Sequence, residues 1–166
     1  VPYLLTADVL IRSFMAFVAF CFAASTIYIF NDMMDVEADR AHPTKRNRPL
    51  ASGALSIRTA GLCAAGLCAA ALVLGVASGL WVLVFVVLYL LINLGYCLQW
   101  KHIPLVDVFL ISAGFMLRIL AGTVGLGINP SSWLLLCSFM LTLFLGFSKR
   151  RAELLVMEKK ESLDLL

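Results

Sequence analysis

Three aspartates, Asp32, Asp35 and Asp39, have a spacing that could bind a metal ion. Separations of three and four residues place all three carboxylates on one face if a single helix runs through them. Like charges on adjacent turns repel each other, so we expect a cation between them, and Mg²⁺ prefers oxygen ligands of this kind. Asn31 adds a neutral amide beside the acids. The alternative is a solvated helix end that binds nothing.

The segment that follows the acids, residues 42–53 with sequence HPTKRNRPLASG, carries the cations Lys45, Arg46 and Arg48. Arginine suits bidentate contact with phosphate oxygens, and lysine supplies a point charge. Acids that hold a metal, next to cations that hold phosphate oxygens, suit a metal–diphosphate substrate. The alternative is anchoring at the membrane surface, which explains Arg58 and Arg46 without any ligand.

The composition indicates that a bilayer surrounds most of the chain. Of the 166 residues, 62% are apolar and 14% are charged, and the mean hydropathy is +0.98. Soluble domains are nearer about 45–50% apolar and about 25% charged. A soluble globule could not bury this much apolar surface, and a disordered chain is excluded by the same figures.

Two long uncharged stretches define most of the membrane spans. The run from Thr59 to Trp100 has no charged residue, and as one helix it would reach about 63 Å. The hydrocarbon core is about 30 Å thick, so the run is two spans joined by a turn at Ser78-Gly79. The stretch from Ile119 to Ser148 is interrupted by GLGINP at 125–130. The predicted spans are 9–30, 59–77, 80–99, 103–124 and 131–148.

The basic residues predict the orientation of these spans. Eleven of the 13 lie in the segments that follow the first, third and fifth spans. Five spans then place every basic segment on one side, which we expect to be the cytoplasmic side of the cell (inner) membrane. The net charge of +3 is therefore a topology signal. It does not indicate a nucleic-acid partner, because the acids lie in the same segments.

Two charges lie inside the fourth span. Asp107 and Arg118 share one helical face but stand roughly 16 Å apart along the axis, so each needs a partner elsewhere. We expect Asp107 to line the active cavity. Arg118 lies deep in the span and is either a substrate-binding residue or half of a buried ion pair. Gly114, Gly122 and Gly125 on this side of the helix are expected to allow close helix approach.

Further candidates lie in the second and third basic segments. Tyr96 and Lys101 flank the end of the third span. Tyr96 is either an interfacial aromatic or a substrate contact, and Lys101 is either a substrate contact or a topology anchor. Lys149, Arg150 and Glu153 follow the fifth span. Cations here suit a lipid phosphate, and topology anchoring is again the alternative.

The stretch NDMMDVEADRAHPTKRNRPLASG resembles the first aspartate-rich motif of the UbiA superfamily of intramembrane prenyltransferases. The resemblance implies an all-α transmembrane bundle of about nine spans with a polar cavity for Mg²⁺ and a diphosphate. It also implies that metal binding falls on Asn31, Asp32, Asp35 and Asp39 and phosphate binding on Lys45 and Arg48. We therefore expect 1–166 to be a single catalytic domain with five spans present, truncated at both ends.

The third basic segment departs from the common pattern of that superfamily, since FSKRRAEL contains no second aspartate-rich DxxxD motif. With this segment the chain resembles the branch that transfers 5-phosphoribose from phosphoribosyl diphosphate to a polyprenyl phosphate. The early motif and the stretch KHIPLVDVFLISAGFMLRILAG also resemble that branch. This resemblance makes Asp32, Asp35, Asp39, Lys149 and Glu153 the expected catalytic set. The alternatives are prenyl transfer from a prenyl diphosphate to an aromatic acceptor and, in a different class, a membrane transporter.

Overall fold

The computed structural model describes residues 6–100, 103 and 105–164, and for residue 153 and residues 156–164 it describes the backbone alone. Within these residues every regular element is helical, in agreement with the predicted all-α class. The elements in order are α1 (Ala7–Met34), α2 (Val36–Ala41), η2 (Lys45–Asn47), α3 (Ile57–Ser78), α4 (Leu80–Leu98), α5 (Val106–Gly122), η4 (Val124–Leu126) and α6 (Ser132–Asp164).

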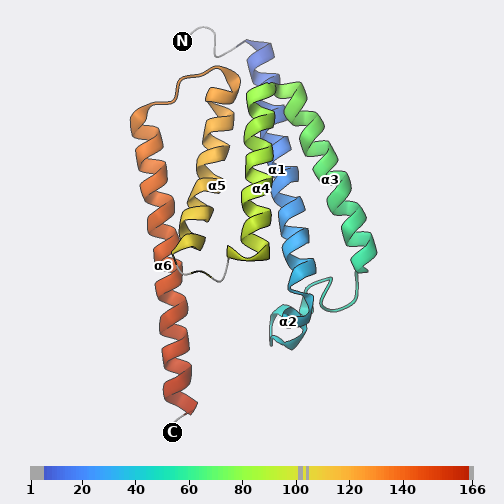
Figure 1. Ribbon diagram of the computed structural model, residues 1–166, viewed down its shortest axis with the longest axis vertical. Helices are drawn as coiled ribbons and strands as arrows, with labels where there is room; N and C mark the ends of the chain where they lie inside the picture. The colour runs from blue at the N-terminus through green and yellow to red at the C-terminus, as the bar shows by residue number, and fades with distance from the viewer. Residues whose placement is uncertain (1–5, 101–102, 104, 165–166) are drawn as a thin grey trace.

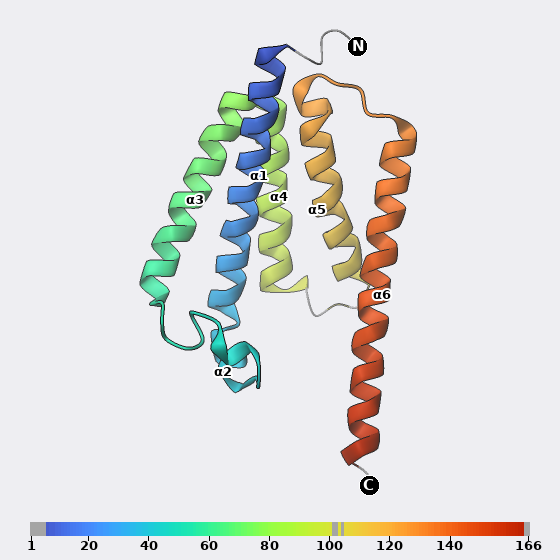
Figure 2. The same cartoon turned by 180° about the vertical axis from the view of Figure 1, so that it is seen from behind.

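In the described part of the chain, five helices are long and apolar enough to cross a membrane, namely α1, α3, α4, α5 and α6. They match the predicted spans to within a few residues, except that α6 continues to Asp164, well beyond the predicted end at 148. The helices lie side by side in the order α3, α1, α4, α5, α6 (Figures 1 and 2), with α1 packed against both α3 and α4. The end of α1 with α2, the end of α4 and the lower part of α6 point to one end of the bundle (Figure 1). This confirms that the described helix ends next to the basic segments share one side.

Several hydroxyl side chains inside the spans donate to the helix that carries them, whereas the buried Ser112 Oγ has no hydrogen-bond partner among the described residues. Ser13 donates to the Val9 carbonyl at 2.7 Å, and Ser78 donates to the Leu74 carbonyl at 2.7 Å. Thr26, Thr123 and Thr142 make the same contact with the carbonyl four residues earlier. Hydrocarbon offers no alternative partner for a hydroxyl group, so this pattern lets polar residues lie within a membrane helix.

The two turns at the far end of the bundle depend on glycine. Gly79 alone separates α3 from α4, and its φ of 145° is one that residues with a Cβ rarely adopt. Gly127 follows η4 in the left-handed conformation with φ of 77°. The structure thus confirms both predicted breaks, at Ser78-Gly79 and within 125–130.

The interior of the bundle combines small and large side chains, and many other large apolar side chains point outward. Ala19, Ala23 and Ala71 are fully buried where α1, α3 and α4 meet. Phe14 and Trp81 are largely exposed, as are many other large apolar residues on the outer faces. Small residues let helix backbones approach closely where hydrocarbon surrounds the outer faces.

The three glycines predicted to allow close packing differ in how closely another helix approaches them. A Cβ at Gly125 would lie 2.9 Å from Val82 Cγ2, so this glycine does permit a close approach of η4 to α4. Gly114 is only at ordinary contact distance from Tyr89. At Gly122 the prediction is wrong, because no packing partner among the described residues lies within 4 Å of a Cβ built there.

The contrast between Gly125 and Gly122 gives a test of the packing. Gly125→Ala should lower the stability of the bundle by about 1–3 kcal/mol, because the new methyl group overlaps Val82. Gly122→Ala is the matched control and should leave the melting temperature unchanged or slightly raised. Thermal unfolding in detergent, followed by circular dichroism, measures both. Equal melting temperatures for the two variants would contradict the close approach of η4 to α4.

Candidate active site

The aspartates lie where α1 ends and α2 begins. The helix is interrupted at Asp35, whose φ of −97° and ψ of 7° leave the helical range. Its amide still donates to the Asn31 carbonyl at 3.0 Å, and the Asp39 amide donates to the Asp35 carbonyl at 2.8 Å. The helical hydrogen-bond spacing therefore continues across the break, although the structure has two helices where the sequence suggested one.

The cation between the acids is the guanidinium group of Arg48. Its Nη1 donates to Asp32 Oδ1 at 2.9 Å and to Asp39 Oδ2 at 2.8 Å. Asp39 is only 4% exposed, so its charge needs a partner at close range. In the structure the cation next to Asp32 and Asp39 is therefore Arg48, a side chain that the sequence had suggested for phosphate binding.

The segment that carries Arg48 folds back against the end of the bundle. Arg40 Nε donates to the Ala51 carbonyl at 3.1 Å, and Leu50 and Ala51 are buried. The turn before η2 is closed by His42 Nδ1, which accepts from the backbone amide of Thr44 at 3.3 Å. These contacts fix the backbone on both sides of Arg48 independently of its ion pairs.

The other residues expected near the acids have more open surroundings. Asn31 and Asp35 are half-buried, and Lys45 is exposed on η2. Tyr96 is half-buried on α4 and packs against the core. Lys101 lies outside the described residues.

A second charged group joins α5 to α6 at the same end of the bundle. Arg150 Nε donates to Asp107 Oδ2 at 2.6 Å, and Arg150 Nη2 forms an ion pair with the same oxygen. Asp107 is 3% exposed, and its other oxygen, Oδ1, has no hydrogen-bond partner. The helices approach closely one turn earlier, where a Cβ at Gly146 would lie 2.6 Å from Val108 Cγ1. This approach brings Arg150 within reach of Asp107.

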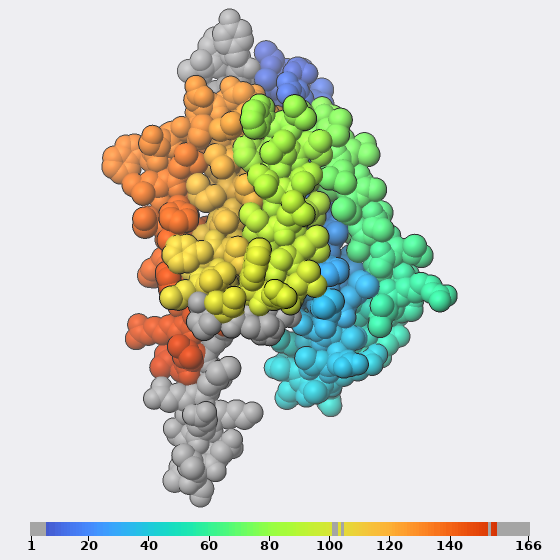
Figure 3. Space-filling model, viewed as in Figure 1, coloured from blue at the N-terminus to red at the C-terminus, as the bar shows by residue number. Residues whose placement is uncertain are grey.

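The cations around Arg150 face outward. Lys149 is exposed on α6, and the side chain of Glu153 lies outside the described residues. Figure 3 shows α4 and α5 forming a closely packed front, with the α2 region on one side and the lower part of α6 on the other. The Asp32–Arg48 group and the Asp107–Arg150 group therefore occupy two sides of one end of the bundle.

Arg118 is held by aromatic side chains. Its Nη2 donates to the Tyr89 hydroxyl at 2.8 Å, and its guanidinium carbon lies 5.0 Å from the centre of the Tyr89 ring and 5.2 Å from that of Phe115. No carboxylate in the described part of the chain forms an ion pair with it. The suggestion of a buried ion pair is therefore wrong for these residues, because cation–π contacts and a phenol oxygen take that role.

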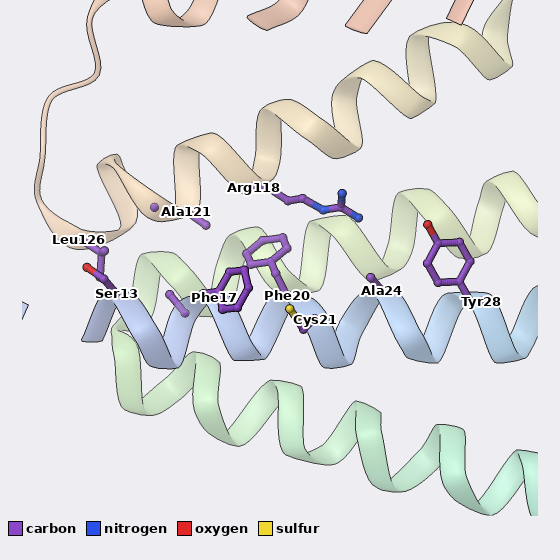
Figure 4. A pocket seen from close by; sticks show the side chains of 11 residues that line it. Ser13, Phe17, Phe20, Cys21, Ala24, Tyr28, Arg118, Ala121 and Leu126 are labelled. Atoms are coloured by element: carbon purple, nitrogen blue, oxygen red, sulfur yellow. The ribbon is translucent and has the colours of Figure 1, made fainter. Parts of the chain in front are cut away.

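An apolar cavity of about 430 Å³ lies between α1 and α5 (Figure 4). Arg118 reaches into it from α5 towards the end marked by Tyr28. The α1 residues that line it recur every turn along one face of the helix, and they are Ser13, Ala16, Phe17, Phe20, Cys21, Ala24 and Tyr28. Asp32 is the next residue of this series, four after Tyr28. The cavity and the acids therefore share one face of α1, a signal that was present in the sequence and was missed.

The chemistry of the acids suits Mg²⁺ only in part. Asp32 and Asp39 each place an oxygen within hydrogen-bond distance of a single nitrogen atom, so two carboxylates converge on one point. Among the described residues no group of three or more acids, histidines or cysteines could hold a metal ion. Mg²⁺ is commonly bound through one or two carboxylates together with substrate phosphates. The donor set fits such a shared site.

These features define a multi-span helical membrane protein with an acid–arginine cluster at one end of an apolar cavity. Residues 4–152 match the UbiA prenyltransferase family. The chain belongs to that family.

Relatives and a solved structure support the assignment. The chain is 46% identical over 147 residues to a decaprenyl-phosphate phosphoribosyltransferase of Corynebacterium glutamicum, covering 87% of this chain and 44% of the relative. It is 42% identical to a protein of the same name from Mycolicibacterium smegmatis, covering 92% of this chain and 48% of the relative. A UbiA homolog from Archaeoglobus fulgidus, solved bound to GPP and Mg²⁺, aligns with a TM-score of 0.72 at 20% identity, covering 83% of this chain and 49% of that one.

The likeness to the solved structure confirms the predicted UbiA-type fold, and the relatives carry the name of the branch that the motifs resemble. The chain spans about half the length of the curated relatives it matches.

The Asp107–Arg150 pair gives a second test of the structure. Asp107→Asn should lower the free energy of unfolding by about 1–3 kcal/mol, because Arg150 loses the charge that a buried carboxylate provides. Asp8→Asn is the matched control: its side chain is 76% exposed and lies 3.8 Å from Arg12, so the expected loss is below about 0.5 kcal/mol. Thermal unfolding in detergent measures both, and equal losses would contradict the role of the α5–α6 pair.

Proposed function

We propose that this chain belongs to the catalytic domain of an Mg²⁺-dependent transferase that moves 5-phosphoribose from phosphoribosyl diphosphate to a polyprenyl phosphate. The reaction would take place at the cytoplasmic face of the inner membrane. The observation that carries the proposal is the convergence of Asp32, Asp39 and Arg48 at the end of the α1 face that lines the apolar cavity. The names of the relatives support the choice of donor and acceptor.

The donor would bind at the first charged group. Asp32, Asp35 and Asp39 would hold the metal–diphosphate, with Asn31 in support. Lys45 and Arg48 would contact the phosphate oxygens. When bound, Mg²⁺ neutralises negative charge on the departing diphosphate.

The acceptor would bind between the first charged group and α6. A phosphate oxygen of the lipid attacks the anomeric carbon of the ribose, the bond from that carbon to the diphosphate oxygen breaks, and diphosphate leaves. The nucleophile is already anionic at neutral pH, so the reaction needs no strong general base. Lys149 and Arg150 would position the lipid phosphate, Glu153 would complete this part of the site, and Tyr96 and Lys101 would contribute from the end of α4.

The apolar cavity would hold the first part of the isoprenoid chain. Its walls are apolar apart from Ser13, Tyr28 and Arg118, and it leads along α1 towards Asp32. Asp107 would act through Arg150, with which it pairs at the charged end of the bundle.

The second candidate is prenyl transfer to an aromatic acceptor, which the family name and the GPP-bound homolog favour. The absence of a second DxxxD motif in FSKRRAEL counts against it. Membership of a transferase family disfavours the transporter hypothesis.

A product assay on the full-length protein tests the proposed reaction. Radiolabelled phosphoribosyl diphosphate, polyprenyl phosphate and Mg²⁺ should yield a labelled lipid. Asp39→Asn should lower kcat/KM by about a hundredfold or more, because transition-state charge is left unbalanced. Glu37→Gln, an exposed neighbour on α2, is the control and should keep full activity. The absence of labelled lipid, together with product from a prenyl diphosphate and an aromatic acid, would favour the second candidate.

A separate experiment tests the role of the cavity. Cys21→Trp places a large ring in the cavity and should raise the KM for the lipid by on the order of tenfold, with no change in the KM for the donor. Cys63→Trp is the matched control, because Cys63 is equally exposed but lies on α3 outside the cavity. Steady-state kinetics with each substrate varied in turn provide the measurement. An equal effect of the two tryptophans would rule out the cavity as the lipid site.

A further inference from the structure

Arg48 occupies the point at which the two carboxylates converge. One nitrogen, Nη1, donates to both Asp32 and Asp39, so a single guanidinium group balances the pair. A metal ion that bound both carboxylates would have to take the place of this nitrogen. Binding of a metal here is therefore a competition with a side chain of the protein.

The competition is unfavourable for a bare divalent cation. The cation would gain the two carboxylates, but Arg48 would lose both of its partners and remain close to the new positive charge. A cation that arrives with a diphosphate brings negative oxygens of its own, and these suit the planar donors of a guanidinium group. Arg48 then exchanges one set of anionic partners for another.

The structure allows Arg48 to make this exchange by moving its side chain alone. Its side chain is 39% exposed, so it has room to turn. Its backbone is held by hydrogen bonds from its amide to the Lys45 carbonyl at 2.9 Å and from the Ser52 amide to its own carbonyl at 2.8 Å. The bond from Arg40 to Ala51 does not involve the Arg48 side chain.

We propose that Arg48 is a displaceable internal cation, so that the site binds a divalent metal more tightly as its diphosphate complex than as the bare ion. On binding, the Arg48 guanidinium moves from Asp32 and Asp39 to the diphosphate oxygens, and the metal takes its place between the carboxylates. The inference rests on the proposed metal–diphosphate site and adds the form in which the metal enters.

Binding of Mn²⁺ alone to the full-length protein, measured by electron paramagnetic resonance without any diphosphate, tests the inference. Arg48→Gln should bind Mn²⁺ more tightly than the wild type by on the order of tenfold, because the competing charge is gone. Arg48→Lys keeps a cation and should stay close to the wild type. Arg46→Gln, an exposed neighbour, is the control and should change nothing. Equal affinities for Arg48→Gln and the wild type would overturn the inference.

A measurement on the wild-type protein is independent of how the variants fold. Phenylglyoxal modifies accessible arginines, and peptide mass spectrometry reports the labelling of each one. Saturating Mn²⁺ alone should increase the labelling of Arg48, because the metal expels it from the carboxylates, and should leave Arg46 unchanged. Unchanged labelling of Arg48 with Mn²⁺ bound would show that the metal does not displace it.

Failure of this inference and failure of the proposed function give different results. Adding Asp32→Asn to Arg48→Gln should abolish the gain in Mn²⁺ affinity, and a gain that persists would overturn the inference. Labelled lipid from the wild type, with no gain in Arg48→Gln, contradicts only the displaceable cation. A clear gain in a protein that makes no labelled lipid supports the displaceable cation and contradicts only the proposed function.

Discussion

An uncompensated charge is unfavourable in or near hydrocarbon, and this constraint governs how the bundle is held together. The buried carboxylates are paired by cations from distant parts of the sequence, Asp39 by Arg48 and Asp107 by Arg150. Arg118 lies beside aromatic rings and a phenol oxygen. These pairings fix the segment after α2 against α1 and fix α6 against α5. The contacts that bring together the proposed site are thus the same contacts that satisfy the charges.

Helix α1 links the charged end to the apolar interior. Its small side chains let α3 and α4 pack closely against one part of its surface. Another part carries the cavity residues from Ser13 to Tyr28 and then Asp32. Because both groups lie on one rigid helix, a lipid chain in the cavity would present its phosphate near the acids without a movement of the backbone. The apolar and ionic parts of the proposed substrates are therefore accommodated by a single element.

Local features of the sequence were sufficient to predict the spans. An uncharged run whose helix would exceed the thickness of the bilayer must be divided into two spans, and Gly79 marks the point of division. The convergence of Asp32 and Asp39 was also predictable, because helical spacing is local. The partners of the buried carboxylates could not be predicted in this way. Arg48 reaches Asp32 across 16 residues and a turn, and Arg150 reaches Asp107 across 43 residues and another helix. Such contacts depend on how helices pack, for example at Gly146, and periodicity carries no information about that.

The two charged groups at this end differ in the carboxylates they offer, and this difference divides the proposed work. Around Asp32, two carboxylates converge on one nitrogen of Arg48, so a metal that takes its place gains two ligands and can bring a diphosphate with it. Around Asp107, the one described carboxylate is paired with Arg150, and the neighbouring Lys149 and Arg151 are exposed. These cations would attract a lipid phosphate. An anionic donor and an anionic acceptor would therefore each have a charged group of their own on two sides of one end of the bundle, and the metal that neutralises the donor would lower the repulsion between them.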